Sequence, residues 1–397
     1  MLRIAILSLL LVAASAHAQP KSRTGWLSDY AAARAEAKRT GKPLMVIFRC
    51  EPCGEHGAFD EQVTRLNPEI AAAADKFVRV RLTRITGVDL RLFEFDYDTA
   101  WFTFLMNADE TVYGRFGGRD AGDADRRLSL KGLRFALDQA LEAHKTPPPA
   151  IERAGKALTV SDFAAARKVK GGCVHCHNVN EFSRADAKAA GTFDREQFRV
   201  YPLPENVGLN LDVEQGNRVL KVAPESPAAK AGMQAGDLIR TLNTLPVNSL
   251  ADASYALHKA GTSGSIKVTF TREGKPQAAS LEVAEGWRKT NLSWRPSMLN
   301  FLPRLEFSGD ELSPDERKAL GLTATQVAFR QDKFVHSTLK AIGIVKDDVV
   351  VGIDGRAMDG NMKHFLSDVR GRYLVGDKAT LNLLRDGKKL DVPITLK

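Results

Sequence analysis

All four cysteines of the chain fall in two Cys-x-x-Cys pairs, Cys50 with Cys53 and Cys173 with Cys176. The chain has 397 residues, which is enough for several domains at about 150 residues each. No cysteine remains for a disulfide between distant segments. We therefore expect each pair to have local chemistry, as a dithiol, a structural disulfide or a set of cofactor ligands.

The second pair belongs to the run Cys173-Val174-His175-Cys176-His177, which matches the attachment signature of c-type haem. Two thiols one helical turn apart can bond the two vinyl groups of one porphyrin, and the adjacent histidine can then ligate the iron. We therefore predict a covalent haem c bound by Cys173 and Cys176, with His177 as the iron ligand. A zinc half-site or a second dithiol remains open, although no other cysteine pair is left to complete a zinc site.

The segment around this signature, residues 150–202, is short and mostly helical in character. No methionine lies between His177 and Met233. The sixth iron ligand would then be a histidine from elsewhere, such as His144, or be absent. An open sixth position would favour small-ligand sensing over fast electron transfer.

The N-terminal residues have the pattern of a secretory signal. Arg3 precedes an apolar run over residues 4–14, and Ala16-His17-Ala18 offers a cleavage site, so we predict a signal peptide over residues 1–18. The alternative is an uncleaved anchor, but the run is short for a bilayer span. We expect a periplasmic protein with no membrane span after cleavage.

Charge and composition limit the class of partner. The formal net charge is +9, from 57 basic and 48 acidic residues. There is no dense run of Lys and Arg and no interleaving of aromatic with basic residues, so we expect no nucleic-acid binding. We also expect no nucleotide cofactor.

Residues 26–145 have the alternation of helical and strand patterns that is typical of an α/β domain. The continuous apolar run over residues 44–48 predicts a strand buried on both faces. Cys50 follows this strand, and a segment that can be helical extends to about Leu66. The N–H groups and dipole of a helix start would stabilise a thiolate at Cys50. Further strands are expected over residues 77–82 and 101–106, with helices over residues 28–38 and 131–143.

This layout resembles the thioredoxin fold. The resemblance implies that Cys50 is the nucleophile and that Cys53 resolves a mixed disulfide. The chain departs from the family at two places: Arg49 stands where thioredoxins have a tryptophan, and no proline lies near Ala100, where they have a cis-proline. A redox-active pair and a purely structural disulfide therefore both remain open.

The C-terminal half contains an internal repeat. Residues 231–239 are echoed by residues 342–350, and the same offset relates Asn243 to Asp354. Nearly equal offsets relate two further pairs of segments, which are 207–209 with 320–322 and 272–275 with 385–388. Because four matches occur in the same order, we predict two copies of one domain, over residues 205–290 and 305–397.

The repeats resemble PDZ domains of the bacterial type that accompany periplasmic quality-control proteases. Such domains add an extended peptide to a sheet edge, and backbone N–H groups of a glycine-containing loop bind its terminal carboxylate. The resemblance implies peptide-binding loops at Val207, Gly208, Leu209, Asn210 and Leu211 and at Leu320, Gly321 and Leu322. One or both grooves could instead be closed and serve as spacers. We find no Gly-x-Ser-x-Gly run and no recognisable Ser/His/Asp arrangement of a protease.

The fold class expected is multidomain α/β plus mainly-β: a thioredoxin-like domain, a short helical segment with the haem signature, and two PDZ-like domains. The order resembles a group of exported bacterial thioredoxin-like/PDZ proteins, some of which place selenocysteine at the redox position. Our leading hypothesis is a periplasmic redox protein, a possible thiol–disulfide oxidoreductase, that couples a dithiol and a haem to PDZ-mediated binding of protein partners, one of them a redox partner. The alternatives are a non-enzymatic PDZ adaptor in envelope quality control and a haem-based sensor.

Overall fold

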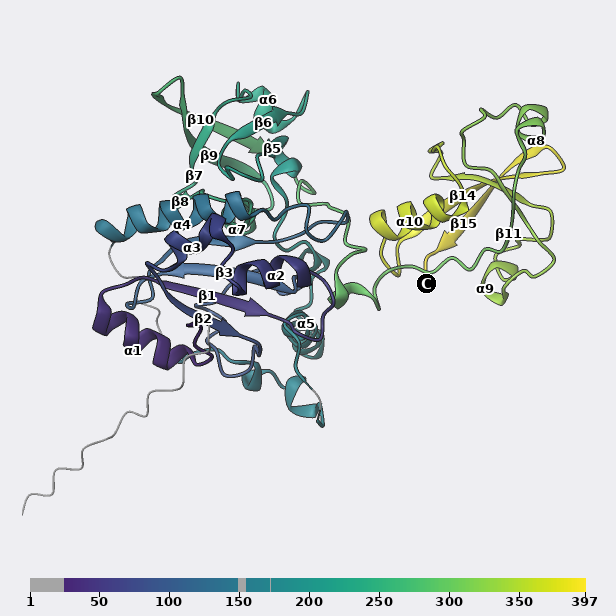
Figure 1. Ribbon diagram of the computed structural model, residues 1–397. Helices are drawn as coiled ribbons and strands as arrows, with labels where there is room; N and C mark the ends of the chain where they lie inside the picture. Colours follow the sequence, from purple (N-terminus) through teal and green to yellow (C-terminus); the bar gives the residue numbers. More distant parts are fainter. Residues whose placement is uncertain (1–24, 149–154, 172) are drawn as a thin grey trace, which may run out of the picture.

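The computed structural model describes residues 25–148, 155–171 and 173–397. The predicted signal peptide lies outside the described residues. Figure 1 shows an N-terminal sheet with helices on both sides, a first repeat packed beside it, and a second repeat set apart at the end of an extended connection. The expected combination of an α/β domain with mainly-β domains is confirmed.

The N-terminal domain is built on a four-stranded sheet of order β2-β1-β3-β4. The central strand β1 is parallel to β2 and antiparallel to β3, and β3 is antiparallel to β4. The strands are β1 (Leu44–Arg49), β2 (Val78–Leu82), β3 (Trp101–Met106) and β4 (Val112–Gly117). The helices are α1 (Tyr30–Thr40), α2 (Gly57–Thr64), α3 (Pro68–Ala74) and α4 (Leu130–Lys145).

Strand β1 is buried along its whole length, as its apolar run predicts. Its side chains alternate between two cores because successive residues of a strand point to opposite faces. Val46 and Phe48 join a core that includes α1, whereas Met45 and Ile47 join a core that includes α2, α3 and α4. Helices therefore cover both faces of the sheet.

The segment with the haem signature packs on the N-terminal domain. Its described residues form the 3-10 helices η1 (Val160–Asp162), η2 (Ala166–Lys168) and η3 (Arg195–Phe198) and the α-helix α5 (Asn178–Ala189). Cys176, Val179 and Phe182 are buried in the same core as Phe48 and Phe95. The segment is thus an extension of the first domain's core.

The first repeat consists of a four-stranded sheet, order β10-β9-β7-β8, and a two-stranded sheet, β5-β6. Its elements are η4 (Pro204–Val207), β5 (Leu209–Leu211), β6 (Val219–Val222), α6 (Pro227–Lys230), β7 (Leu238–Leu242), β8 (Leu245–Pro246), α7 (Leu250–Lys259), β9 (Gly264–Arg272) and β10 (Lys275–Val283). A connection containing η5 (Pro296–Met298) leads to the second repeat.

The second repeat has one five-stranded sheet of order β11-β12-β13-β14-β15. Its elements are β11 (Gly309–Glu311), α8 (Pro314–Ala319), β12 (Phe329–Gln331), α9 (Ser337–Lys340), β13 (Val349–Ile353), α10 (Met362–Arg372), β14 (Lys378–Arg385) and β15 (Lys388–Thr395). This repeat has its own apolar core, which includes Phe329, Phe365 and Leu381.

The two repeats share an ion-pair clamp, which lies at positions that the sequence offsets match to each other. The carboxylate of Asp237 is fully buried and lies 2.7 Å from Nε of Arg272, which also donates to the carbonyl of Gly232. The equivalent carboxylate, Asp348, is buried in the same way and lies 2.7 Å from Nε of Arg385. The same buried ion pair therefore occurs in both repeats.

Candidate functional site

The first cysteine pair lies directly after β1 and forms a disulfide, Cys50–Cys53. The backbone N–H of Cys50 donates to the carbonyl of Ala100, 2.9 Å away, so the residue before β3 faces the pair as the thioredoxin alignment predicts. Cys50 is 6% exposed, whereas Cys53 is half-buried. Cys53 is therefore the more exposed residue of the pair, although Cys50 was the predicted nucleophile.

A turn, and not a helix start, surrounds the pair. Helix α2 begins only at Gly57, after His56 in a left-handed conformation with φ 60°. The expectation that the pair opens a helix is therefore wrong, because three residues lie between Cys53 and Gly57, the first helical residue. The dipole of α2 is correspondingly a weaker influence on the sulfurs, since it acts within about one turn of a helix end.

Arg49 ties this turn together. Its guanidinium is buried and donates to the carbonyls of Glu55 at 2.8 Å, Cys53 at 3.1 Å and Ala100 at 3.1 Å. Asp60 lies 3.5 Å from its Nε and balances its charge. Arg49 thus fixes the loop geometry as well as placing a positive charge beside the pair.

The residue that reasoning from the sequence missed is His175. Its Nδ1 lies 3.2 Å from Sγ of Cys50 and 3.7 Å from Sγ of Cys53. The sequence places this histidine inside the haem signature, where it had no predicted role at the other pair. No local spacing connects residues this far apart in the chain, so only the packing of the segment reveals the contact.

His175 is held in place by its neighbours in the motif. Its backbone N–H donates to Oδ1 of Asn178 at 2.9 Å. Cys176 is buried in the core of the N-terminal domain, and Val174 packs against that core. Asn180 on α5 donates to Asp98 at 3.0 Å, which fixes the helix to the loop before β3. The motif therefore presents His175 to the disulfide from a well-anchored loop.

The second cysteine pair has two different environments. Cys173 is exposed and Cys176 is buried, and burial raises the pKa of the Cys176 thiol to about 12. A covalent haem needs both thiols at the edge of one porphyrin. Because Cys176 belongs to the apolar core and Cys173 is exposed, both thiols would reach one porphyrin edge only with Cys176 outside that core. His177, the predicted iron ligand, is half-buried, with Nδ1 3.0 Å from Oε1 of Glu181.

Two other histidines, His144 and His56, are engaged elsewhere. His144 was a candidate sixth ligand, but Nδ1 lies 2.9 Å from the hydroxyl of Tyr113 and Nε2 lies 2.9 Å from the carbonyl of Gly41. His56, which is close to Cys53 in sequence, is buried with Nδ1 2.7 Å from Asp125. Burial lowers the pKa of His56. These bonds hold both rings in structural roles.

A buried charge cluster supports the loop that precedes β3. Arg295, from the connection between the repeats, is 2% exposed and lies 2.6 Å from Asp96 and 3.2 Å from Asp98. Ser297 donates to Asp98 from both its backbone N–H and its hydroxyl, at 2.9 Å each. Burial raises the pKa of Asp96. The connection therefore fixes the loop that leads to Ala100, which faces the disulfide.

The two predicted peptide-binding loops differ. Gly208 has φ 89°, and a Cβ there would overlap the hydroxyl of Ser226, so glycine is required. Strand β5 follows at once, with Leu209 and Leu211 buried and Asn210 exposed. In the second repeat Gly321 has φ 69°, but no atom lies within 4 Å of the place a Cβ would take. Among the described residues no strand follows it until β12.

The first repeat contacts the N-terminal domain along α7. The β4 residue Arg115 donates its backbone N–H to Asp252 at 2.9 Å, and its carbonyl accepts the hydroxyl of Ser249. The guanidinium of Arg115 lies 3.5 Å from the ring centroid of Tyr255. These contacts satisfy polar groups on the free edge of β4, which would otherwise be open to pairing with another chain.

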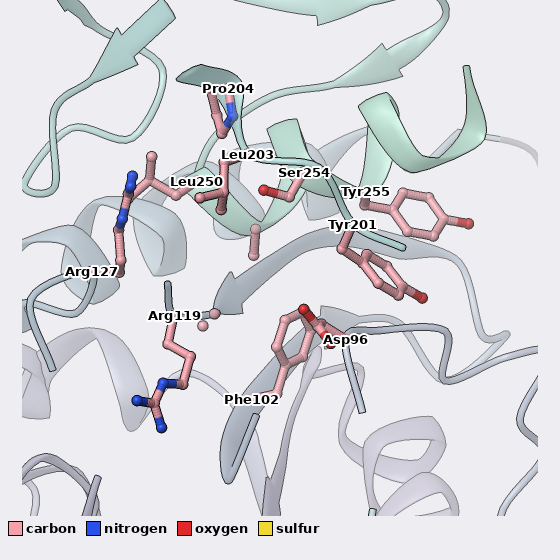
Figure 2. Close-up of a pocket in the computed structure, with 13 residues that line it drawn as sticks. Asp96, Phe102, Arg119, Arg127, Tyr201, Leu203, Pro204, Leu250, Ser254 and Tyr255 are labelled. Atoms are coloured by element: carbon pink, nitrogen blue, oxygen red, sulfur yellow. The ribbon is translucent and has the colours of Figure 1, made fainter. Parts of the chain in front are cut away.

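A pocket lies where these two domains meet (Figure 2). The first repeat contributes Leu250, Ser254 and Tyr255 of α7, and the N-terminal domain contributes Phe102 and Arg119. Arg127 joins the two sides at its rim through an ion pair of 2.8 Å with Glu205 in η4. Both η4 and α7 of the first repeat therefore face the N-terminal domain.

No helix among residues 25–148, 155–171 and 173–397 is both long and apolar enough to cross a bilayer.

Comparison with known proteins identifies the two domain types. A thioredoxin-like family model matches residues 25–108, and a PDZ domain family model matches residues 206–283. Thioredoxin-like and PDZ domains are therefore both present.

Curated relatives are periplasmic serine proteases. The chain is 36% identical over 146 residues to the periplasmic pH-dependent serine endoprotease DegQ of Escherichia coli, covering 36% of this chain and 30% of that protein. It is 27% identical over 150 residues to the periplasmic serine endoprotease DegP of the same species, covering 38% and 29%. The chain thus spans about a third of the length of these relatives.

Among solved structures, the HtrA-type protease AlgW with decapeptide shares 16% identity and a TM-score of 0.21, covering 45% of this chain and 54% of that one. The serine endoprotease from Yersinia pestis shares 28% identity and a TM-score of 0.18, covering 20% and 28%.

Proposed function

We propose that this chain works in the periplasm in envelope protein quality control, as a PDZ-bearing adaptor that binds polypeptide partners. The observation behind the proposal is the PDZ match over residues 206–283, together with the periplasmic proteases among the relatives. The Gly208 loop supports binding through the first repeat, because its left-handed glycine directly precedes strand β5, at the position of the glycine-containing loop that PDZ domains use for a terminal carboxylate.

Binding of fluorescent peptides with free C-termini, followed by polarisation, tests this proposal. Gly208→Ala should weaken peptide binding at least about tenfold, because the new Cβ collides with Ser226. Gly321→Ala is the matched control, since it changes the equivalent loop where no atom is close. Unchanged binding by a folded Gly208→Ala protein, or no binding of any peptide by the wild type, would refute the adaptor proposal.

A second candidate function is thiol–disulfide exchange with those partners, and the contact between His175 and Cys50 favours it. A partner thiolate would attack the sulfur of Cys53, the more exposed residue of the pair, and Cys50 would leave as a thiolate beside His175. A second partner thiol, losing its proton, would then attack the mixed disulfide and release Cys53. The partner dithiol becomes a disulfide while the Cys50–Cys53 bond takes up two electrons and two protons.

Trapping of mixed disulfides tests this order of events. Cys50→Ser should accumulate a partner joined to Cys53, whereas Cys53→Ser should accumulate much less. The opposite pattern would restore Cys50 as the attacked residue, and absence of adducts with either variant would leave a structural disulfide. A reduction potential far below that of the compartment would also indicate a structural role.

Covalent haem at Cys173 and Cys176 with His177 as ligand, in a redox or sensing role, stays a prediction. When bound, such a group would supply one-electron chemistry or small-ligand binding. The pyridine haemochrome spectrum of protein made with c-type maturation machinery tests it, with Cys173→Ala/Cys176→Ala as the control.

A further inference from the structure

We propose that the reduced pair Cys50 and Cys53 binds, together with His175, one thiophilic d10 metal ion, Zn²⁺ or Cu⁺. This inference goes beyond the adaptor and exchange functions and rests only on the pair being reducible. Two thiolates and one imidazole form a ligand set that suits both ions. The three ligand atoms lie within 4.8 Å of one another.

The distances agree with such a site. A tetrahedral zinc ion with ordinary Zn–S and Zn–N bonds holds its nitrogen and sulfur ligands about 3.5 Å apart. Nδ1 of His175 lies 3.2 Å and 3.7 Å from the two sulfurs, on either side of that value. Reduction breaks the bond between the sulfurs and lets them separate, so His175 already lies where a third ligand would be needed.

The surroundings provide a partly closed site. Cys50 is buried, while Cys53 and His175 are half-buried, so a fourth position for water or a partner group is open toward solvent. The buried guanidinium of Arg49 fixes the turn through the carbonyls of Cys53 and Glu55.

Metal and disulfide exclude each other at this site. The disulfide leaves no thiolate for a metal ion, and a bound ion prevents the two sulfurs from forming a bond. Metal binding would therefore stabilise the reduced pair. Oxidation by a partner disulfide would form the Cys50–Cys53 bond and release the ion, and the partner disulfide would become a dithiol by taking up the two electrons and two protons from water. The haem signature would in this way contribute a ligand, His175, to the other cysteine pair.

The test uses the full mature chain, reduced and freed of reductant without oxygen, with its thiols counted first. A thiol count of four shows that the pair is reducible, so a failure to bind metal cannot be confused with a locked disulfide. Co²⁺ is then titrated as a spectroscopic probe, followed by displacement with Zn²⁺. A parallel titration presents Cu⁺ against a competing chelator, which distinguishes the two ions.

We expect one equivalent of Co²⁺ with a thiolate charge-transfer band, and binding of Zn²⁺ or Cu⁺ weakened at least about tenfold by His175→Ala. Cys53→Ser should abolish the band. His336→Ala is the matched control, because this histidine lies in the second repeat, beside Glu306. The proposal is overturned if the reduced protein binds none of the three ions, if His175→Ala binds normally, or if Cys173→Ser or His177→Ala abolishes binding.

Discussion

The two repeats have the same ion-pair clamp but different relations to the rest of the chain. The first repeat is fixed to the N-terminal domain by α7, and its Tyr255 and Lys259 both reach Glu94. The second repeat meets the connection through Leu374, which joins a small cluster with Phe198 and Met298. Figure 1 shows it set apart from the other domains.

The difference comes from a few polar side chains at one helix start. Ser249 caps α7, and its hydroxyl also reaches the carbonyl of Arg115 on β4. The equivalent cap of α10 is Asn361, whose side chain accepts from His364 in its own helix. The cap of α7 therefore also meets the open edge of β4, whereas the cap of α10 bonds within its own helix.

The largest expected effect is at Arg295. Arg295→Leu leaves Asp96 and Asp98 buried without their partner, so the free energy of unfolding of the part before residue 305 should fall by about 3–5 kcal/mol. All four tryptophans lie in that part, so their fluorescence reports its unfolding. Hydrogen exchange in β14 and β15 should remain unchanged. Equal loss of protection in the second repeat would show that the two parts unfold together.

A second prediction concerns pH. Burial raises the pKa of Asp252 to about 6 and lowers that of His258 to about 4. Between pH 4 and 6 folded Asp252 keeps a proton that the unfolded chain loses, so this group favours folding less as pH rises. Folded His258 stays neutral in a pH range in which the unfolded chain binds a proton. Its contribution to the free energy of unfolding therefore increases with pH up to about 6.5. As pH rises, the two groups therefore change the free energy of unfolding in opposite directions.

Single substitutions should separate the contributions of Asp252 and His258 to the pH dependence of the free energy of unfolding. Asp252→Asn should make the tryptophan-monitored stability increase with pH relative to wild type, by about 1.4 kcal/mol per pH unit between pH 4 and 6. His258→Gln should make it decrease over the same range. Urea unfolding at several pH values measures both. If the free energy of unfolding changed with pH in the same way in wild type and both variants, the assignment of these pKa shifts to Asp252 and His258 would be wrong.

A smaller effect is expected at the helix caps. Ser249→Ala should cost about 1–2 kcal/mol, since it removes both the cap of α7 and the bond to Arg115. Faster hydrogen exchange of the Arg115 amide should accompany it. Asn361→Ala is the matched control and should cost about 1 kcal/mol in the second repeat only. Equal exchange at Arg115 in both variants would refute the docking role of Ser249.

The smallest effect is expected at the exposed ion pair between Arg195 and Asp377, which lie 2.9 Å apart. Both side chains are partly open to solvent, at 44% and 32% exposure. Arg195→Ala should therefore change the free energy of unfolding by less than about 0.5 kcal/mol. A larger change, measured by urea unfolding, would mean that the second repeat is docked more firmly than this contact indicates.

Much of the fold could be predicted from the sequence because its signals are local. The apolar run of β1 indicates a strand buried on both faces, and the repeat spacing matches Asp237 and Arg272 to Asp348 and Arg385. The boundaries of α4 differ from prediction by one or two residues, which is ordinary for helix ends. The start of α2 was wrong because His56 takes a left-handed conformation that no propensity indicates.

The sequence by itself determined the domain types, their order and the residues able to do thiol chemistry, since strand periodicity, helix caps and motif spacing act over a few residues. Only the tertiary structure brought His175 to the Cys50–Cys53 pair and Arg295 to Asp96. Such contacts depend on which apolar surfaces are buried together. Cys176, Val179 and Phe182 joined the core of the first domain, and that burial placed a motif resembling a haem site beside a disulfide more than 100 residues away.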